Sequence, residues 1–306
     1  MESTFMRTVR ARTDAAIASG DLQPIQADQV VLQDQGLSFI VRWVAALAAK
    51  DAAGKPASGP GGATILPGGP RDPGFNPFLN PDPALLVGTA GDHHVAILNK
   101  FPVCRHHLVL ARRVFAEQQA PLEQVDFQAL AAILSAEGGL GFYNGGAAAG
   151  ASQRHKHVQW IPASDQNASL RALGAGMPEG LPLGAISRHP ALPLAHRFAR
   201  VDAGQGADVQ ASARSMLTAF GQACAELDLR AGVDGLLPPC NMLAGDGWML
   251  VLPRSKEHFQ GVSLNALSFG GTIYVRDPAQ IDAIRAAGPL KALADVAFPA
   301  SGRQPA

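Results

Sequence analysis

The chain has 306 residues, of which 47% are hydrophobic and 16% are charged, so we expect one large or two ordinary globular domains and exclude a fibrous or wholly disordered chain. Lysine plus arginine and aspartate plus glutamate each number 25, which gives a formal net charge of +0. Because no bulk charge attracts nucleic acid or an anionic membrane, neither is expected as a partner, and an anionic ligand must be bound by a local group of residues.

The N-terminal region predicts a helix followed by two strands. Residues 4–19 have the apolar spacing of an amphipathic helix, which Asp-Leu-Gln-Pro at 21–24 ends. Strands are expected around 29–32 and over 37–44. The N-terminal segment lacks the apolar core of a signal peptide, and apolar runs such as 248–252 are far shorter than a membrane span, so we expect a cytoplasmic protein.

A long loop and a group of strands come next. Residues 51–83 are crowded with Gly and Pro and have neither helical nor strand periodicity, and such a loop is either a lid or disordered. From Ala84 the segments ALLVG, HHVAILNKF and HHLVLARR read as strands, which we expect to be antiparallel neighbours. Residues 121–136 predict a helix, with Pro at its start and Gly138-Gly139 at its end.

The second half of the chain shows the same mixture of elements. A helix is predicted over 207–229, and strands over 241–244, 247–253 and 269–276. Strands and helices do not alternate regularly, so the fold class is predicted as α+β rather than doubly wound α/β. The stretches ILNKFPVCRHHLVL and LVLPRSKEHFQGVSL share a pattern, which indicates either an internal duplication or chance.

The densest chemistry lies in FYNGGAAAGASQRHKHVQWIP, residues 142–162. If 154–161 is a strand, its alternation places His155, His157 and Gln159 on one face, with neighbours about 6.5–7 Å apart. The small residues just before this strand allow backbone N–H groups to approach a phosphate. The segment therefore predicts an anion site beside a row of polar side chains.

A neutral imidazole in such a row can attack a phosphorus centre and form a phosphoramidate. The alternatives are half of a metal site or two solvated surface histidines. Cys104, Cys224 and Cys240 are odd in number and far apart, so they form no disulfide framework or C-x-x-C motif, and no acidic cluster supplies further ligands. We therefore expect no metal ligands and three reduced, mostly structural thiols.

The motif GGAAAGASQRHKHVQ resembles the active-site signature of the ATP adenylyltransferases, or diadenosine tetraphosphate phosphorylases, of the histidine-triad superfamily. In this branch Gln replaces the third histidine, as Gln159 does here. The further matches are FYNGG at 142–146, LNKFPV at 98–103, NMLAGDGWMLVLPRSKE at 241–257 and VSLNALSFGGTIYVR at 262–276. The resemblance covers most of the chain except the loop 51–83. It implies a histidine-triad-like antiparallel sheet flanked by helices over 1–165, and a sheet-and-helix half over 190–302 that completes the nucleotide site.

The resemblance also implies roles for individual residues. His157 is expected to be the nucleophile that becomes adenylylated, His155 to support it, and Gln159 to hold a phosphoryl oxygen. An amide is no base at neutral pH, so Gln159 should not activate water, which favours phosphorolysis over hydrolysis. The remaining positions that match nucleotide-binding residues are Lys50, Asn99, Lys100, Asn144, Gly150, Ala151, Ser152, Gln153, Asn265, Ala266, Leu267, Thr272 and Arg276. Lys55 is the alternative to Lys50.

The implied reaction is the cleavage of diadenosine tetraphosphate by phosphate to ATP and ADP, through an adenylyl-histidine. The expected partners are dinucleoside polyphosphates, ATP, ADP and inorganic phosphate. No cofactor is expected to be tightly bound, and any divalent cation such as Mg²⁺ should arrive with the polyphosphate. The alternatives are a sugar-1-phosphate uridylyltransferase, against which Lys156 argues, a dinucleoside polyphosphate hydrolase, and a non-catalytic nucleotide sensor, against which an intact His157 argues. The choice of adenylyl sulfate or a particular dinucleotide, the base selectivity and the oligomeric state stay open.

Overall fold

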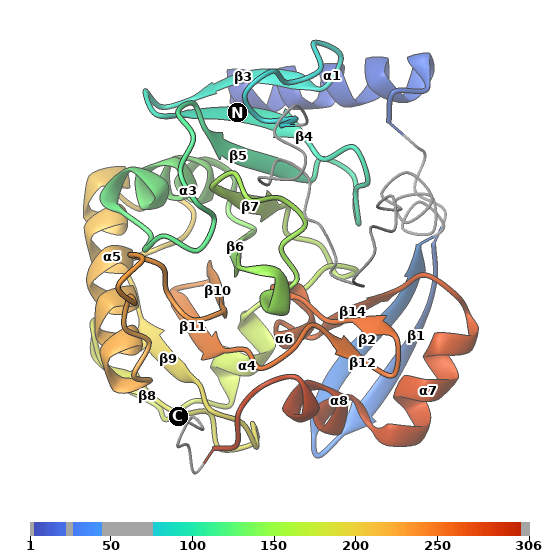
Figure 1. The fold of residues 1–306 in the computed structure, drawn as a ribbon, viewed down its shortest axis with the longest axis vertical. Helices are drawn as coiled ribbons and strands as arrows, with labels where there is room; N and C mark the ends of the chain where they lie inside the picture. The colour runs from blue at the N-terminus through green and yellow to red at the C-terminus, as the bar shows by residue number, and fades with distance from the viewer. Residues whose placement is uncertain (1–2, 23–26, 45–75, 301–306) are drawn as a thin grey trace.

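The computed structural model describes residues 3–22, 27–44 and 76–300 (Figure 1). Its helices are α1 (Thr4–Ser19), α3 (Gln124–Glu137), α4 (Arg171–Ala175), α5 (Val209–Glu226), α6 (Ala266–Phe269), α7 (Ala279–Ala287) and α8 (Pro289–Asp295), with a 3-10 turn η1 (Ala147–Ala149). The strands of the first half are β1 (Ala27–Asp34), β2 (Leu37–Val44), β3 (Leu86–Ala90), β4 (His94–Leu98), β5 (Leu108–Arg112), β6 (Leu140–Gly145) and β7 (His157–Ile161). Those of the second half are β8 (Ile186–Ser187), β9 (Arg197–Arg200), β10 (Cys240–Gly245), β11 (Trp248–Pro253), β12 (His258–Phe259), β13 (Val262–Ser263) and β14 (Thr272–Val275).

A nine-stranded antiparallel sheet runs through both halves, in the order β3-β4-β5-β7-β6-β10-β11-β9-β8. The predicted α+β class and the antiparallel pairing of β3, β4 and β5 are confirmed. The elements β4-β5-α3-β6-β7 recur as β8-β9-α5-β10-β11, and the two sets meet at the β6–β10 pair. The chain thus contains a topological repeat. This repeat does not relate ILNKFPVCRHHLVL to LVLPRSKEHFQGVSL, because the first stretch begins within β4 and the second within β11, and these two strands are not counterparts.

The two faces of the large sheet bury different cores. On one face α3 and α5 lie side by side (Figure 1). They pack together through Phe127 and Phe220, whose ring centroids are 5.8 Å apart, in a core that includes Val158, Trp160 and Met249. Each such fully buried apolar side chain contributes about 1.5–3 kcal/mol to stability. The opposite face packs on a second core, to which β2, β14, α6, α7 and α8 contribute. Both cores draw residues from both halves of the chain.

Local capping explains where the main helices begin. In α3 the carboxylate of Glu123 and that of Asp126 form a capping box, and Gly138 ends the helix with φ 64°. In α5 the Asp208 carboxylate accepts a hydrogen bond from the backbone N–H of Ala211 at 2.7 Å. These helices, α1 and the strand at 37–44 lie where the sequence predicted them.

Two predicted strands are shorter than expected. The strand expected over 269–276 begins only at Thr272, because the Asn265 side chain caps the short helix α6, which contains Phe269. The strand expected over 154–161 begins at His157. The residues just before it pair with the 116–118 segment instead, and the Lys156 N–H donates to the Ala116 carbonyl at 2.9 Å.

A second sheet joins the two ends of the chain. Its order is β1-β2-β14, and β14 pairs with β2 in parallel, with Thr272 opposite Ile40. Both sheets contain strands from each half, so the sheets do not divide the chain at the predicted boundaries. The division into halves at 1–165 and 190–302 stays a prediction. Within the described ranges, no helix has the length and apolar character to cross a membrane.

Candidate active site

The polar row predicted on β7 lies on the face of the large sheet opposite α3 and α5. Val158 and Trp160 belong to the core under those helices, whereas Gln159 lies opposite Phe142, which belongs to the second core. His157 and Gln159 are 5% and 8% exposed, so they are desolvated but not sealed from the surface. The structure therefore brings the two side chains to one face, as the alternation predicted.

His157 is held in a defined tautomer by the backbone. Its Nδ1 lies 2.8 Å from the carbonyl oxygen of His155. Because a carbonyl only accepts, Nδ1 carries the proton and the lone pair is on Nε2. The Phe78 ring packs against the imidazole, with ring centroids 4.9 Å apart. Nε2 is therefore the nucleophilic atom of this histidine.

His155 is fixed between two other segments. Its Nε2–H donates to the Arg112 carbonyl at 2.7 Å, and its Nδ1 lies 3.1 Å from Asn76 Oδ1. Burial lowers the pKa of His155, although the Arg112 carbonyl opposes this shift. These contacts fix His155, whose backbone carbonyl binds His157 Nδ1.

Arg112 is itself anchored by a buried carboxylate. Its guanidinium donates to both oxygens of Asp126, at 2.6 and 2.8 Å, and His94 Nε2 lies 3.0 Å from the same carboxylate. Burial alone would raise the pKa of Asp126, but the hydrogen bonds from Arg112 and His94 hold it well below its usual value. The ionised Asp126 thus secures the strand whose carbonyl holds His155.

Gln159 has its amide oriented by a second histidine. His107 Nε2–H donates to Gln159 Oε1 at 2.9 Å, which directs the amide NH₂ group to other acceptors. Asn99 Nδ2 lies 3.4 Å from the His107 ring, and Asn99 Oδ1 accepts from the Phe101 N–H at the end of β4. The exposed Lys100 is next to it. The structure therefore links the Asn99-Lys100 motif to the β7 row through His107.

The small-residue loop packs closely on the second half of the chain. Gly150 has φ 89°, and a Cβ there would lie 2.9 Å from the Cβ of Asn265. The N–H groups of Gly150 and Ala151 already donate within the loop, at 2.9 and 3.1 Å. In this conformation Ser152 and Gln153, which are half-buried, are the loop residues left to donate to a phosphate.

Asn144 joins the two halves beside this loop. Its Oδ1 accepts from Asn241 Nδ2 at 2.9 Å and from the Ala266 N–H at 3.0 Å. The Leu267 N–H in turn donates to Asn265 Oδ1. The structure thus brings together Asn144, Gly150 and the Asn265–Leu267 turn.

Arg254 and Lys256, the basic residues at the end of the NMLAGDGWMLVLPRSKE match, both have partners within the chain. Arg254 is 2% exposed and donates to Asn241 Oδ1 at 2.6 Å and to backbone carbonyls, and burial lowers its pKa to about 9. Lys256 pairs with Asp295 at 2.8 Å. In this conformation Arg254 is a structural residue.

Thr272 and Arg276 are predicted residues that no contact among the described residues brings to β7. Thr272 is fully buried on β14, and its Oγ1 has no hydrogen-bond partner among the described residues. The Arg276 carbonyl accepts from Trp43 Nε1 at 2.9 Å, which places it at the end of β2. Lys50 and Lys55 lie outside the described residues, as does most of the loop 51–83.

Sequence reasoning missed three polar residues of this region. Gln118 contacts His157 from a loop that carries no motif. Asn241 lies in the NMLAGDG match, and His107 lies in the strand segment HHLVLARR, but neither was singled out. The only signal for His107 was its position four residues after the LNKFPV motif.

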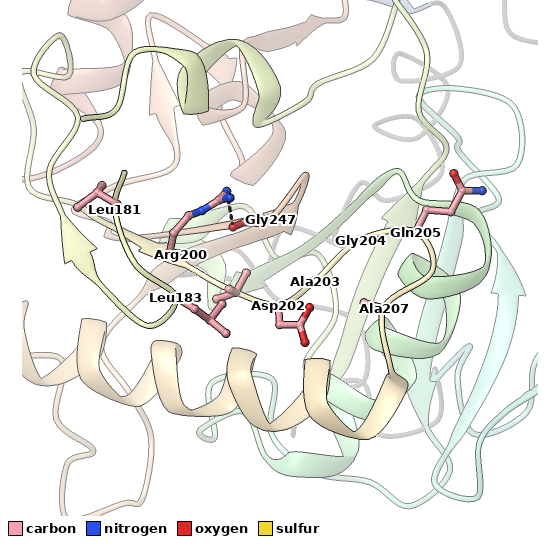
Figure 2. A pocket seen from close by; sticks show the side chains of 10 residues that line it. Leu181, Leu183, Arg200, Asp202, Ala203, Gly204, Gln205, Ala207 and Gly247 are labelled. Carbon is pink, nitrogen blue, oxygen red and sulfur yellow. Dashed lines mark hydrogen bonds between the residues drawn. The ribbon is translucent and has the colours of Figure 1, made fainter. Parts of the chain in front are cut away.

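A pocket in the described part of the chain lies away from this site. Its volume is about 400 Å³. Arg200, Asp202 and the turn before α5 line it (Figure 2). It shares none of the predicted site residues. The Arg200 guanidinium lies 4.7 Å from the centre of the Trp248 ring and donates to the Gly247 carbonyl at 3.2 Å, so its charge is already engaged. Among the described residues, no group of three His, Cys, Asp or Glu side chains is placed to hold a metal ion.

Comparison with known proteins decides the family. A family model described as the Ap4A phosphorylase N-terminal domain matches residues 1–172, and one described as the ATP adenylyltransferase C-terminal domain matches 190–299. The chain belongs to the Ap4A phosphorylase and ATP adenylyltransferase family. The family predicted from the motifs is therefore confirmed, and with it the prediction that this chain is a nucleotidyltransferase enzyme.

Individual relatives agree with this Ap4A phosphorylase assignment. Diadenosine 5',5'''-P1,P4-tetraphosphate phosphorylase 2 of Saccharomyces cerevisiae is 29% identical over 234 residues, which cover 68% of this chain and 70% of the yeast protein. The crystal structure of yeast Ap4A phosphorylase Apa2 with AMP has a TM-score of 0.76 at 21% identity and covers 99% of this chain and 100% of its own. The complex of Apa2 with Ap4A has a TM-score of 0.75 at 21% identity and covers 98% and 99%. These structures share the fold.

Proposed function

We propose that this chain catalyses the phosphorolysis of diadenosine tetraphosphate to ATP and ADP, by reversible transfer of AMP through His157. The observation that carries the proposal is the His157 imidazole, with its Nδ1–H bound to a backbone carbonyl, beside the Gln159 amide on the same face of β7. Family membership and the relative that is named a phosphorylase of this dinucleotide support the same reaction.

In the first step His157 Nε2 attacks the α-phosphorus of one adenosine. The N–P bond forms, the bond from this phosphorus to the bridging oxygen breaks, and ATP leaves with the bonding electrons. The Nδ1–H of His157 stays bound to the His155 carbonyl, which stabilises the positive charge that develops on the ring. The Gln159 NH₂ group, oriented by His107, donates to a phosphoryl oxygen.

In the second step inorganic phosphate takes the AMP group. A phosphate oxygen attacks the same phosphorus, the P–N bond breaks, and ADP forms while the lone pair returns to His157 Nε2. Phosphate is already an anion and requires no general base. Gln159 cannot take a proton from water at neutral pH, so the adenylyl-histidine should survive until phosphate arrives.

Several features of the reaction are proposals that rest on the motifs. The nucleotide is bound beside β7 by the Asn99–Lys100 motif and by the Asn144 and Ser152–Gln153 region, which lies nearest to the phosphates. A divalent cation such as Mg²⁺ arrives with the polyphosphate, and no residue of the chain is assigned to it. ATP, ADP and phosphate as ligands, the absence of nucleic-acid and membrane partners, and the cytoplasmic location stay predictions.

Acceptor dependence tests the proposal directly. The protein is incubated with diadenosine tetraphosphate with and without phosphate, the nucleotides are separated, and the quenched protein is analysed by mass spectrometry. We expect turnover to ATP and ADP only when phosphate is present. When it is absent, one equivalent of ATP per protein should be released, together with an acid-labile adenylyl adduct on His157. If AMP is released at the same rate with and without phosphate and no adduct forms, the chain is a hydrolase. If nucleotide binds without any cleavage, it is a sensor.

A further inference from the structure

Gln118 occupies a gap between the two central strands of the first half. Pairing between β6 and β7 runs from Leu140 opposite Ile161 to Phe142 opposite Gln159 and then stops. Continued in the same register, the pairing would place Tyr143 opposite Val158 and then Asn144 opposite His157. Gln118, from the connection between β5 and α3, is 3% exposed and contacts both Asn144 and His157.

The amide of Gln118 makes the hydrogen bonds that the missing strand pair would have made. Its Oε1 accepts from the His157 N–H at 2.8 Å. Its Nε2 donates to the His157 carbonyl at 3.1 Å and to the Asn144 carbonyl at 2.9 Å. One neutral side chain thus satisfies three buried backbone groups and keeps the two strands apart by its own width.

Gln118 is itself fixed at both ends. Its N–H donates to the Arg154 carbonyl at 2.6 Å, and its carbonyl accepts from the Tyr143 hydroxyl. The neighbouring Glu117 pairs with the Arg154 guanidinium. A side chain anchored in this way has little freedom to rotate, so its amide sets the distance between β6 and β7.

We propose that Gln118 is a positioning residue for His157. Where the strands separate, the amide of Gln118 holds the backbone of His157 on both its N–H and its carbonyl, and the Asn144 side chain on the facing strand accepts from the Ala266 N–H. The proposal rests on the nucleophilic role of His157 in the proposed function. A displacement of about 1 Å in a reacting group can cost on the order of 100-fold in rate, which is the effect that Gln118 prevents.

The test compares Gln118→Met and Gln118→Asn with the control Gln119→Met. Methionine keeps the length but removes all three hydrogen bonds, whereas asparagine keeps the amide but cannot reach both strands. Gln119 is the adjacent residue of the same type, and it donates one hydrogen bond to the Leu237 carbonyl at 3.0 Å. The single-turnover rate of adenylyl-enzyme formation, the dissociation constant for AMP and the melting temperature are measured for each protein.

We expect the rate of adenylylation to fall by about 10- to 100-fold in Gln118→Met and by less in Gln118→Asn, while the AMP dissociation constant changes by about twofold at most. The control should stay within about twofold of the wild type in both quantities. If Gln118→Met does not fold, Gln118→Asn decides the question. A wild-type rate in either folded variant, or equal losses of rate and AMP affinity, overturns the positioning role. A wild type that forms no adduct overturns the proposed function itself.

Discussion

The two halves of the large sheet have the same order of elements but differ in what one face carries. On β7 that face presents His157 and Gln159, whereas on β11 it presents Trp248, Leu250 and Leu252, which all belong to the second apolar core. The strand arrangement therefore does not determine the chemistry. In the proposed function, a few polar side chains on one strand make the first half reactive, and the second half supports it.

Two histidines show the same difference at atomic scale. His157 and His196 each place Nδ1 at 2.8 Å from the carbonyl oxygen two residues earlier. The Nε2 of His196, however, accepts the His189 N–H at 2.8 Å. The Nε2 lone pair of His196 is therefore used for a structural hydrogen bond, whereas the proposed function assigns the Nε2 lone pair of His157 to the attack on phosphorus.

Removing the nucleophile should have the largest effect. We expect His157→Ala to lose more than about 1,000-fold in AMP transfer, because no other group forms the covalent intermediate. Thermal unfolding and AMP binding should change little. His93→Ala, at an exposed histidine, is the control and should keep its activity. Appreciable phosphorolysis by His157→Ala would remove the chemical distinction between the two halves.

Changing Gln159 to histidine should alter the product as well as the rate. The variant loses the amide that His107 orients, so we expect about 100- to 1,000-fold slower transfer. The new imidazole can accept a proton from water, so the ratio of AMP to ADP should rise. Nucleotide separation after incubation with phosphate measures both effects, and Gln210→His on the exposed face of α5 is the control. An unchanged ratio would mean that Gln159 does not select the acceptor.

The matching face of the second half should affect stability only. Leu250 is fully buried, and Leu250→Ala should lower the free energy of unfolding by about 2–5 kcal/mol through the cavity that it leaves. Urea titration measures this loss. The kcat per folded molecule should stay within about twofold of the wild type. A large decrease in kcat at unchanged AMP affinity would show that β11 takes part in catalysis.

The smallest effect concerns pH. Burial lowers the pKa of His196 from 6.5 to about 4, so between these values the unfolded chain binds a proton that the folded chain does not. Stability should therefore fall as the pH drops through this window, by up to about 3 kcal/mol, and this loss should be absent near pH 7. Urea unfolding near pH 7 and near pH 5 tests this. His196→Gln, which keeps an acceptor for the His189 N–H, should show a smaller decrease, and an equal decrease would assign the effect to other groups.

The sequence predicted well what neighbouring residues decide. Alternation in RHKHVQW placed His157 and Gln159 on one face, and the acids and glycines around 121–139 predicted α3. The predicted ends of elements were wrong where a polar side chain caps the backbone. Asn265, for example, caps a short helix in a region where the sequence predicted part of a strand. Such caps depend on a few polar atoms, which apolar periodicity does not reveal.

Contacts between distant segments were beyond this kind of reasoning. The parallel pairing of β2 with β14 joins residues more than 200 positions apart, and the Asn144–Asn241 hydrogen bond joins the two halves. Gln118 acts through a gap between strands, which no pattern in its own loop predicts. The sequence did not locate the two copies of the topological repeat, because they share the order of their elements rather than their side chains.

The β6–β10 pair at the centre of the large sheet would allow the chain to be divided into two fragments whose reassembly restores activity. A break within 162–185, between β7 and β8, would give two fragments in which β6 and β10 are unpaired edges. Each fragment would also expose half of both cores, so neither should be stable alone. Reassembly would restore the sheet and the link from Asn144 to Asn241 and Ala266 together. The rate of turnover would then measure the fraction of fragments that have reassembled.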